Sequence, residues 1–80
     1  MTSDLTLYHY YECTYCGKVH KYLKANNIVV PMKNTRENPA YRAELIKIGG
    51  KGQVPCLVID GLALYESDDI IEWFRENWKK

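Results

Sequence analysis

Two cysteines separated by two residues, Cys13 and Cys16, constrain this chain more than any other feature of its sequence. They follow an apolar-rich run, residues 5–9, and precede residues 19–23, whose apolar spacing suits a helix. We therefore expect the pair on a turn between a strand and a helix. Two thiols at this spacing can interchange between dithiol and disulfide, so the motif is typical of a redox site.

The position at a helix start predicts how the two thiols divide the chemistry. Unpaired N–H groups and the positive end of the helix dipole favour an anion there, and so favour the thiolate of a first-turn cysteine. We expect Cys13 to be partly thiolate near neutral pH and to act as the nucleophile. Cys16, one turn further along, is then placed to attack a mixed disulfide formed at Cys13.

Other uses of this motif find less support in the sequence. A zinc site would need two more ligands from Cys56, His9, His20 and carboxylates, with no second Cys-x-x-Cys or His-x-x-x-His, so we expect no metal to be required. A structural disulfide over so short a loop would constrain the unfolded chain little. An iron–sulfur cluster held by Cys13 and an external thiol remains an open alternative.

Length and composition limit the partners. Eighty residues, 46% of them apolar, suit one compact domain over residues 1–80. Eleven basic against ten acidic residues predict neither a nucleic-acid nor a membrane partner. The N-terminus has no basic region with an apolar stretch, and no run approaches the ~20 apolar residues of a membrane span. Three cysteines, an odd number, do not suggest a secreted disulfide framework. We expect a soluble, cytoplasmic protein that is a monomer.

The first half of the chain predicts two strand–helix pairs. Residues 5–9 suit a strand, and residues 14–25 suit a helix that ends at the turn-forming pair Asn26-Asn27. Residues 28–32 suit a second, parallel strand, and Pro31, which has no N–H to donate, predicts either a sheet edge or the end of that strand. Asn38-Pro39 predicts the start of a second helix, which uses Leu45, Ile46 and Ile48 as apolar contacts and stops at Gly49-Gly50.

The second half predicts a hairpin and a last helix. Residues 57–59 and 62–65 flank Asp60-Gly61, a pair that favours a type I′ turn between antiparallel strands. Ser67 is expected to cap a helix with its apolar residues at three- and four-residue spacing. These residues are Ile70, Ile71, Phe74 and Trp78. Asp68 and Asp69 at its start and Lys79-Lys80 at its end suit the helix dipole.

The resulting order, β-α-β-α-β-β-α, is the minimal thioredoxin arrangement, an α/β fold with a four-stranded mixed sheet flanked by three helices. Three short segments carry a further resemblance: Cys-Thr-Tyr-Cys at 13–16, Gln-Val-Pro at 53–55 and Glu-Ser at 66–67. They resemble the glutaredoxins, and more narrowly the branch of the thioredoxin superfamily that is similar to the N-terminal domain of glutathione transferases. The resemblance extends from about residue 5 to residue 78.

The resemblance implies a glutathione site. Pro55 would be a cis proline facing Cys13, and the backbone of Val54 would pair with the cysteinyl part of glutathione. Ser67 would receive the γ-glutamyl carboxylate at a helix start, and Glu66 would face the ammonium group. Gln53 would lie beside the peptide backbone and Tyr15 beside the sulfur. Lys51 or Arg36 would meet the glycyl carboxylate.

Two residues depart from the glutaredoxin pattern. Thr14 replaces the proline that usually stands between the cysteines, and Tyr10 replaces a lysine that many glutaredoxins carry three residues before the first cysteine. The second change removes a cation from the thiol's surroundings. No all-helical second domain is visible in the sequence, so conjugation of glutathione to electrophiles is not expected.

The sequence thus predicts an enzyme, a glutathione-dependent thiol–disulfide oxidoreductase of the dithiol type that reduces protein disulfides and glutathione mixed disulfides. Glutathione would be its reductant, and its partners would be disulfide or glutathionylated proteins. The alternative is a module that binds glutathione or an iron–sulfur cluster with little turnover. Three other residues have simpler interpretations: Cys56 is expected in the core, and His9 and His20 are expected to be structural or exposed.

Overall fold

The sequence around the cysteine pair folds as a strand, a short loop and a helix. The computed structural model describes residues 4–78, and within them β1 spans Leu5–His9 and α1 spans Thr14–Ala25. The elements that follow are β2 (Met32–Asn34), α2 (Pro39–Gly49), β3 (Cys56–Ile59), β4 (Leu62–Tyr65) and α3 (Ser67–Asn77). This is the predicted order, and Cys13 lies directly before the first turn of α1.

The four strands form one mixed sheet in the order β2-β1-β3-β4. β1 runs parallel to β2 and antiparallel to β3, with Leu7 opposite both Met32 and Leu57. β3 and β4 form the predicted hairpin. Asp60 and Gly61 at its tip have φ of 50° and 86°, and two positive φ values are what a type I′ turn requires. The predicted thioredoxin-like fold is therefore confirmed.

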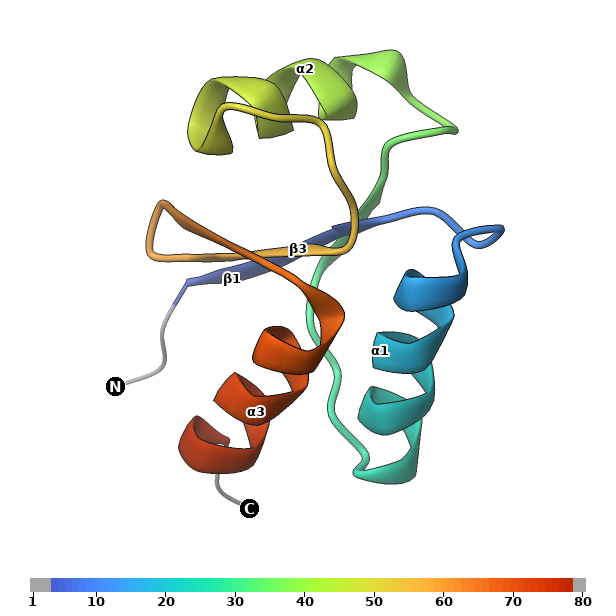
Figure 1. Ribbon diagram of the computed structural model, residues 1–80, viewed down its shortest axis with the longest axis vertical. Helices are drawn as coiled ribbons and strands as arrows, with labels where there is room; N and C mark the ends of the chain where they lie inside the picture. Colours follow the sequence, from blue (N-terminus) through green and yellow to red (C-terminus); the bar gives the residue numbers. More distant parts are fainter. Residues whose placement is uncertain (1–3, 79–80) are drawn as a thin grey trace.

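The helices cover both faces of the sheet (Figure 1). α1 and α3 lie side by side on one face, and α2 lies on the other. The α1–α3 side encloses the larger core, formed by nine buried residues: Leu5, Leu7, Val19, Leu23, Ile28, Val30, Leu57, Ile70 and Phe74. The α2 side encloses a smaller core of Tyr8, Leu45, Cys56 and Val58. Cys56 is thus buried in the core, as expected.

The second strand was predicted at the wrong place. Residues 28–32 were expected to form it, but β2 begins at Met32 and ends at Asn34. Pairing with β1 starts only at the carbonyl of Pro31, which accepts a hydrogen bond from the Leu7 N–H at 2.9 Å. Ile28 and Val30 are buried as a connector packed on the core. Their apolar pattern therefore reflects burial without strand pairing.

The apolar face of α2 is narrower than predicted. Leu45 is completely buried, but Ile46 and Ile48 are 37% and 40% exposed. Asn38 caps the helix as expected, accepting from the Ala40 N–H at 3.0 Å, and Gly50 ends it with φ of 90°. The helix approaches the sheet at Gly49, where an added Cβ would lie 2.9 Å from the Ala63 Cβ. This contact turns Leu45 inward and leaves the two isoleucines outside.

The start of α3 also differs from the expectation. Ser67 is the first helical residue and not the cap, because Glu66 occupies the N-cap position with φ of 75° and makes no side-chain capping bond. Trp78 follows the helix as its C-cap, although its ring still packs against Phe74 at 5.9 Å between centroids. The predicted lysines at 79 and 80 lie outside the described residues. None of the helices within residues 4–78 has the length and apolarity to cross a membrane.

Candidate active site

Cys13 occupies the N-cap position of α1 with an extended backbone, φ −78° and ψ 122°. Its sulfur accepts a hydrogen bond from the backbone N–H of Cys16, with the two atoms 3.4 Å apart. The side chain is half-buried, so the sulfur is accessible from solvent. A helix N-terminus aimed at a sulfur stabilises negative charge there, which is the setting that reactive cysteines use.

Cys16 is in the opposite environment. Its side chain has no exposed surface, and burial raises the pKa of its thiol to about 12, with the neighbouring Cys13 adding to the effect. Both cysteines are free thiols. The pair is therefore asymmetric, with an accessible sulfur at Cys13 and a shielded one at Cys16.

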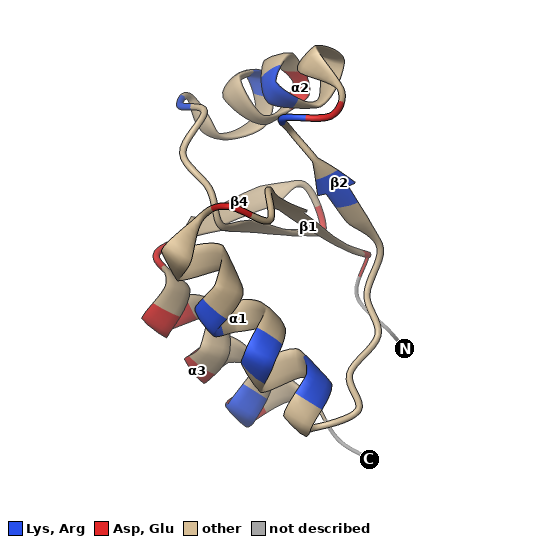
Figure 2. Cartoon of the chain, turned by 90° about the vertical axis from the view of Figure 1, so that its right-hand side faces the viewer, with Lys and Arg blue, Asp and Glu red and all other residues tan. Residues whose placement is uncertain are grey.

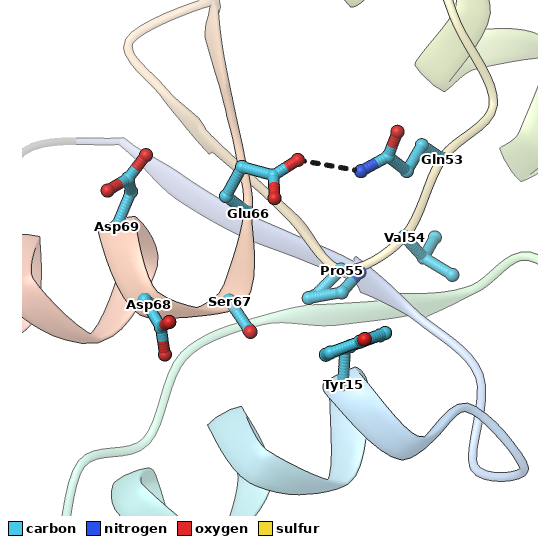
Figure 3. Close-up of a pocket in the computed structure, with 8 residues that line it drawn as sticks. All are labelled: Tyr15, Gln53, Val54, Pro55, Glu66, Ser67, Asp68 and Asp69. Carbon is cyan, nitrogen blue, oxygen red and sulfur yellow. Dashed lines mark hydrogen bonds between the residues drawn. The ribbon is translucent and has the colours of Figure 1, made fainter.

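A cis peptide bond joins Val54 to Pro55, as the resemblance implied. The Cys13 sulfur lies 3.8 Å from the carbonyl oxygen of Val54, so the thiol faces this loop. Beside the loop is an open pocket of about 390 Å³ (Figure 3). It is lined by six of the residues that the resemblance assigned to glutathione, together with two more: Tyr15, Gln53, Val54, Pro55, Glu66, Ser67, Asp68 and Asp69.

Three elements build the pocket. Tyr15, on the first turn of α1, lies against Pro55 and is 65% exposed, and Ser67 begins α3 beside it. Glu66 and Gln53 face each other across the pocket, where the Gln53 amide donates to the Glu66 carboxylate at 3.1 Å. The buried Ser67 lies at a helix N-terminus, where free N–H groups receive anions. The pocket therefore joins an anion-binding end to a carboxylate.

Asp68 and Asp69 also line the pocket, and the sequence analysis used them only as partners of the helix dipole. Asp68 forms an ion pair with Lys18 of α1 at 2.5 Å, linking α1 to α3 at the pocket rim. The signal that could have found them was present, because they directly follow Ser67 in the first turn of α3. Only the fold brings that turn next to Tyr15 and Pro55.

The two cations proposed for the glycyl end lie elsewhere. The Arg36 guanidinium stacks on the Tyr10 ring at 4.3 Å, and the Lys51 ammonium lies 4.7 Å from the centre of the Tyr65 ring. Neither residue is among those lining the pocket. The Arg36 guanidinium nevertheless places a cation beside Tyr10, the position at which many glutaredoxins carry a lysine.

His9 and His20 form an aromatic cluster with Tyr11 behind the cysteine loop. The two imidazoles meet edge to face with ring centres 4.8 Å apart, and His9 is almost completely buried. Burial lowers the pKa of both histidines, and for His9 the nearby His20 lowers it further. Within residues 4–78 no group of three or more His, Cys, Asp or Glu side chains could hold a metal ion.

Comparison with known protein families gives one match. The model of the glutathione S-transferase N-terminal domain covers residues 7–79. The chain belongs to this family. A search of curated proteins finds no match.

Solved structures agree with this assignment. An Omega 3C glutathione transferase from Trametes versicolor is 31% identical, with a TM-score of 0.77 over 95% of this chain. A delta-class glutathione transferase from Nilaparvata lugens is 26% identical, with a TM-score of 0.78 over 95% of this chain. This chain spans 34% and 37% of those two proteins, about a third of each. It therefore matches one part of a transferase.

The fold is also that of a glutaredoxin. The holo form of glutaredoxin C1 from Populus tremula x tremuloides is 20% identical, with a TM-score of 0.71. The match covers 94% of this chain and 77% of that protein. The predicted resemblance to the N-terminal domain of glutathione transferases is therefore confirmed, and the likeness to the glutaredoxin is one of fold.

Proposed function

We propose that this protein is a glutathione-dependent thiol–disulfide oxidoreductase of the dithiol glutaredoxin type. One observation carries the proposal: the Cys13 sulfur receives the helix N–H of Cys16 and faces the cis-proline loop that borders the pocket ending at Ser67. These contacts support the proposal, because a sulfur at one helix N-terminus faces the loop that borders a pocket with a second helix N-terminus, which suits a carboxylate. Tripeptide thiols of the glutathione class carry the two matching groups: a sulfur at the centre of the molecule and an α-carboxylate at one end.

The reaction follows from ordinary thiol–disulfide exchange. The Cys13 thiolate attacks the glutathione sulfur of a mixed disulfide, a new S–S bond forms, the old one breaks, and the released thiolate takes up a proton. The thiolate of a second glutathione then attacks the glutathione sulfur bound to Cys13. This step releases oxidised glutathione and restores the Cys13 thiolate. For a protein disulfide, the Cys13 thiolate first attacks one protein sulfur, which breaks the protein S–S bond and releases the other sulfur as a thiolate. The Cys16 thiol then gives its proton to solvent or to that thiolate and attacks the Cys13 sulfur, which breaks the mixed disulfide and releases the second protein thiolate. The Cys13–Cys16 disulfide left behind is reduced by two glutathione molecules, which become oxidised glutathione.

The pocket residues have separate roles in this proposal. Ser67 and the free N–H groups of α3 bind the γ-glutamyl carboxylate, and Glu66 binds its ammonium group. The Val54 backbone and Pro55 hold the cysteinyl part beside Cys13, and Gln53 and Tyr15 border it. Glutathione is the cosubstrate, and no metal is required. A reducing compartment such as the cytoplasm would suit an enzyme that must return to the dithiol state.

The test is glutathione-coupled reduction of the mixed disulfide between glutathione and 2-mercaptoethanol. The natural chain and Cys16→Ser should both be active, and Cys13→Ser should lose at least ~100-fold in rate because no other accessible thiol lies at a helix N-terminus. Cys56→Ser is the matched control and should keep its activity. Full activity in Cys13→Ser would overturn the proposal. An inactive natural chain that still binds glutathione would favour the binding module.

A further inference from the structure

A second depression lies on the other side of α1 from the glutathione pocket. It is an open groove of about 610 Å³ between α1 and the segment leading into β2. Its lining includes Tyr11, Leu23, Lys24, Ile28, Val29 and Met32. We call it the α1–β2 groove. Because Tyr11 precedes Cys13 by two residues, the groove begins next to the cysteine loop.

The groove exposes apolar side chains that the core does not use. Val29 is 87% exposed, Tyr11 70% and Met32 41%. These residues stand beside the buried Leu23 and Ile28, so they extend the core to the surface. A contiguous apolar surface of this kind on a small domain is characteristic of a binding site.

The charged residues on α1 all have one sign. α1 carries Lys18, Lys21 and Lys24 and no acidic residue, as the blue and tan helix in Figure 2 shows. Lys18 pairs with Asp68 across to α3. Among the ion pairs within residues 4–78, none involves Lys21 or Lys24. These two ammonium groups are therefore available to the carboxylates of a partner.

A stripe on α1 connects the lysines to the nucleophile. Cys13, Gly17, Lys21 and Lys24 follow one another at spacings of four, four and three, so they share one side of the helix. At Gly17 an added Cβ would meet no atom within 4 Å, so the surface between Cys13 and the lysines is open. A chain lying along this stripe passes directly over the bare backbone of Gly17.

We propose that the α1–β2 groove and its lysine stripe bind an extended, acidic and apolar segment of the protein substrate, next to the cysteine that carries the disulfide. This inference rests on the proposed function and adds the substrate class to it. Glutathione would lie on the α3 side of Cys13 and the polypeptide on the β2 side. The two ends of a mixed disulfide would then be held on opposite sides of the attacking sulfur.

The spacing along α1 sets the position of the acidic residues. Lys21 and Lys24 lie about 12 Å and about 16 Å along the helix from Cys13, at 1.5 Å per residue. An extended segment covers these distances in about four and about five residues. Glu12 precedes Cys13 and disfavours an acidic residue beside the disulfide itself. The preferred segment therefore has its acidic residues about four and five positions away from its cysteine, with apolar residues between the cysteine and this acidic pair.

The test uses two glutathionylated peptides that differ only at those two positions, which hold Glu in one and Lys in the other. The natural chain should deglutathionylate the Glu peptide with a kcat/KM about fivefold higher, since two exposed charge pairs each contribute modestly. Lys24→Glu should reduce or reverse this preference, and the matched control Lys47→Glu, on exposed α2, should not. The preference should shrink at high salt.

Two controls separate this inference from the proposed function. Activity on the mixed disulfide of glutathione and 2-mercaptoethanol reports the proposed function alone, and Lys24→Glu should leave it within about twofold. Fluorescence anisotropy of the labelled Glu peptide that carries no glutathione measures binding to the groove alone. Val29→Asp should weaken that binding. Equal kcat/KM for both peptides, or a preference unchanged in Lys24→Glu, would overturn the groove proposal even if the small substrate is reduced.

Discussion

The backbone N–H of Cys16 points at the sulfur of Cys13 across 3.4 Å, while the Cys16 side chain itself is completely buried. One residue therefore supplies both a dipole for the first sulfur and a second sulfur that water does not reach. This arrangement separates the attacking thiol from the resolving thiol before any substrate binds.

The first prediction concerns the order in which the thiols react. Burial raises the pKa of Cys16 to about 12 and that of Cys56 to about 11, so both are protonated near neutral pH. Brief treatment of the reduced protein with iodoacetamide should therefore label Cys13 at least ~100-fold faster than the other two. Peptide mass mapping measures this directly. Rapid labelling of Cys16 in the folded protein would contradict the assignment of roles.

The second prediction concerns acid stability. The pKa values of His9 and His20 are lowered from 6.5 in the folded protein, mainly by burial, so the folded state holds both rings neutral. As the pH falls through 6.5, the unfolded chain takes up protons that the folded protein does not. The stability that these two histidines contribute is therefore full above that pH and decreases as the pH falls below it.

Urea unfolding at about pH 7.5 and about pH 5.5 measures this loss. His20→Gln, at the less buried of the two positions, should make the loss smaller, because it removes one titrating ring and the charge that acts on His9. A loss of the same size in His20→Gln would show that other groups cause the pH dependence.

The third prediction uses two glycines that lie within helices. At Gly49, a Cβ would lie 2.8 Å from Cζ of Tyr65 and 2.9 Å from the Ala63 Cβ. Gly49→Ala should therefore lower the free energy of unfolding by about 2 kcal/mol, since α2 must move away from the hairpin. Gly17→Ala, where a Cβ meets open space in α1, should raise it by about 0.5–1 kcal/mol. Thermal unfolding of both variants should show shifts of opposite sign.

The fourth prediction separates strain from function at Glu66, whose φ of 75° is unusual for a residue with a side chain. Glu66→Gly should raise the free energy of unfolding by about 1 kcal/mol, because glycine adopts this φ without penalty. The same change should raise the KM for glutathione at least about tenfold by removing a charged partner of the ammonium group.

Glu66→Gln is the matched variant for this position, because it keeps the Cβ and removes only the charge. It should raise the KM for glutathione without the gain in stability. If Glu66→Gly leaves the KM unchanged, the role of Glu66 in ammonium binding is wrong.

Local chemistry in the sequence determined most of the element order. Asn38-Pro39 begins α2, Asp60-Gly61 turns the hairpin, and the apolar spacing of residues 14–25 predicted α1 with the bounds that it has. Each of these signals acts between residues close in the chain, so no knowledge of the fold is needed to interpret it. The family resemblance carried by the Cys-x-x-Cys, Gln-Val-Pro and Glu-Ser segments identified six of the eight residues that line the pocket.

Contacts between distant segments decided the rest. β2 begins at Met32, next to the Pro31 carbonyl that accepts from the Leu7 N–H. α2 approaches the hairpin at Gly49, while Ile46 and Ile48 stay partly exposed. The stacking of Arg36 on Tyr10 joins residues that no local pattern relates. Burial and pairing depend on what the neighbouring elements present, so these features exist only once the sheet and helices have assembled.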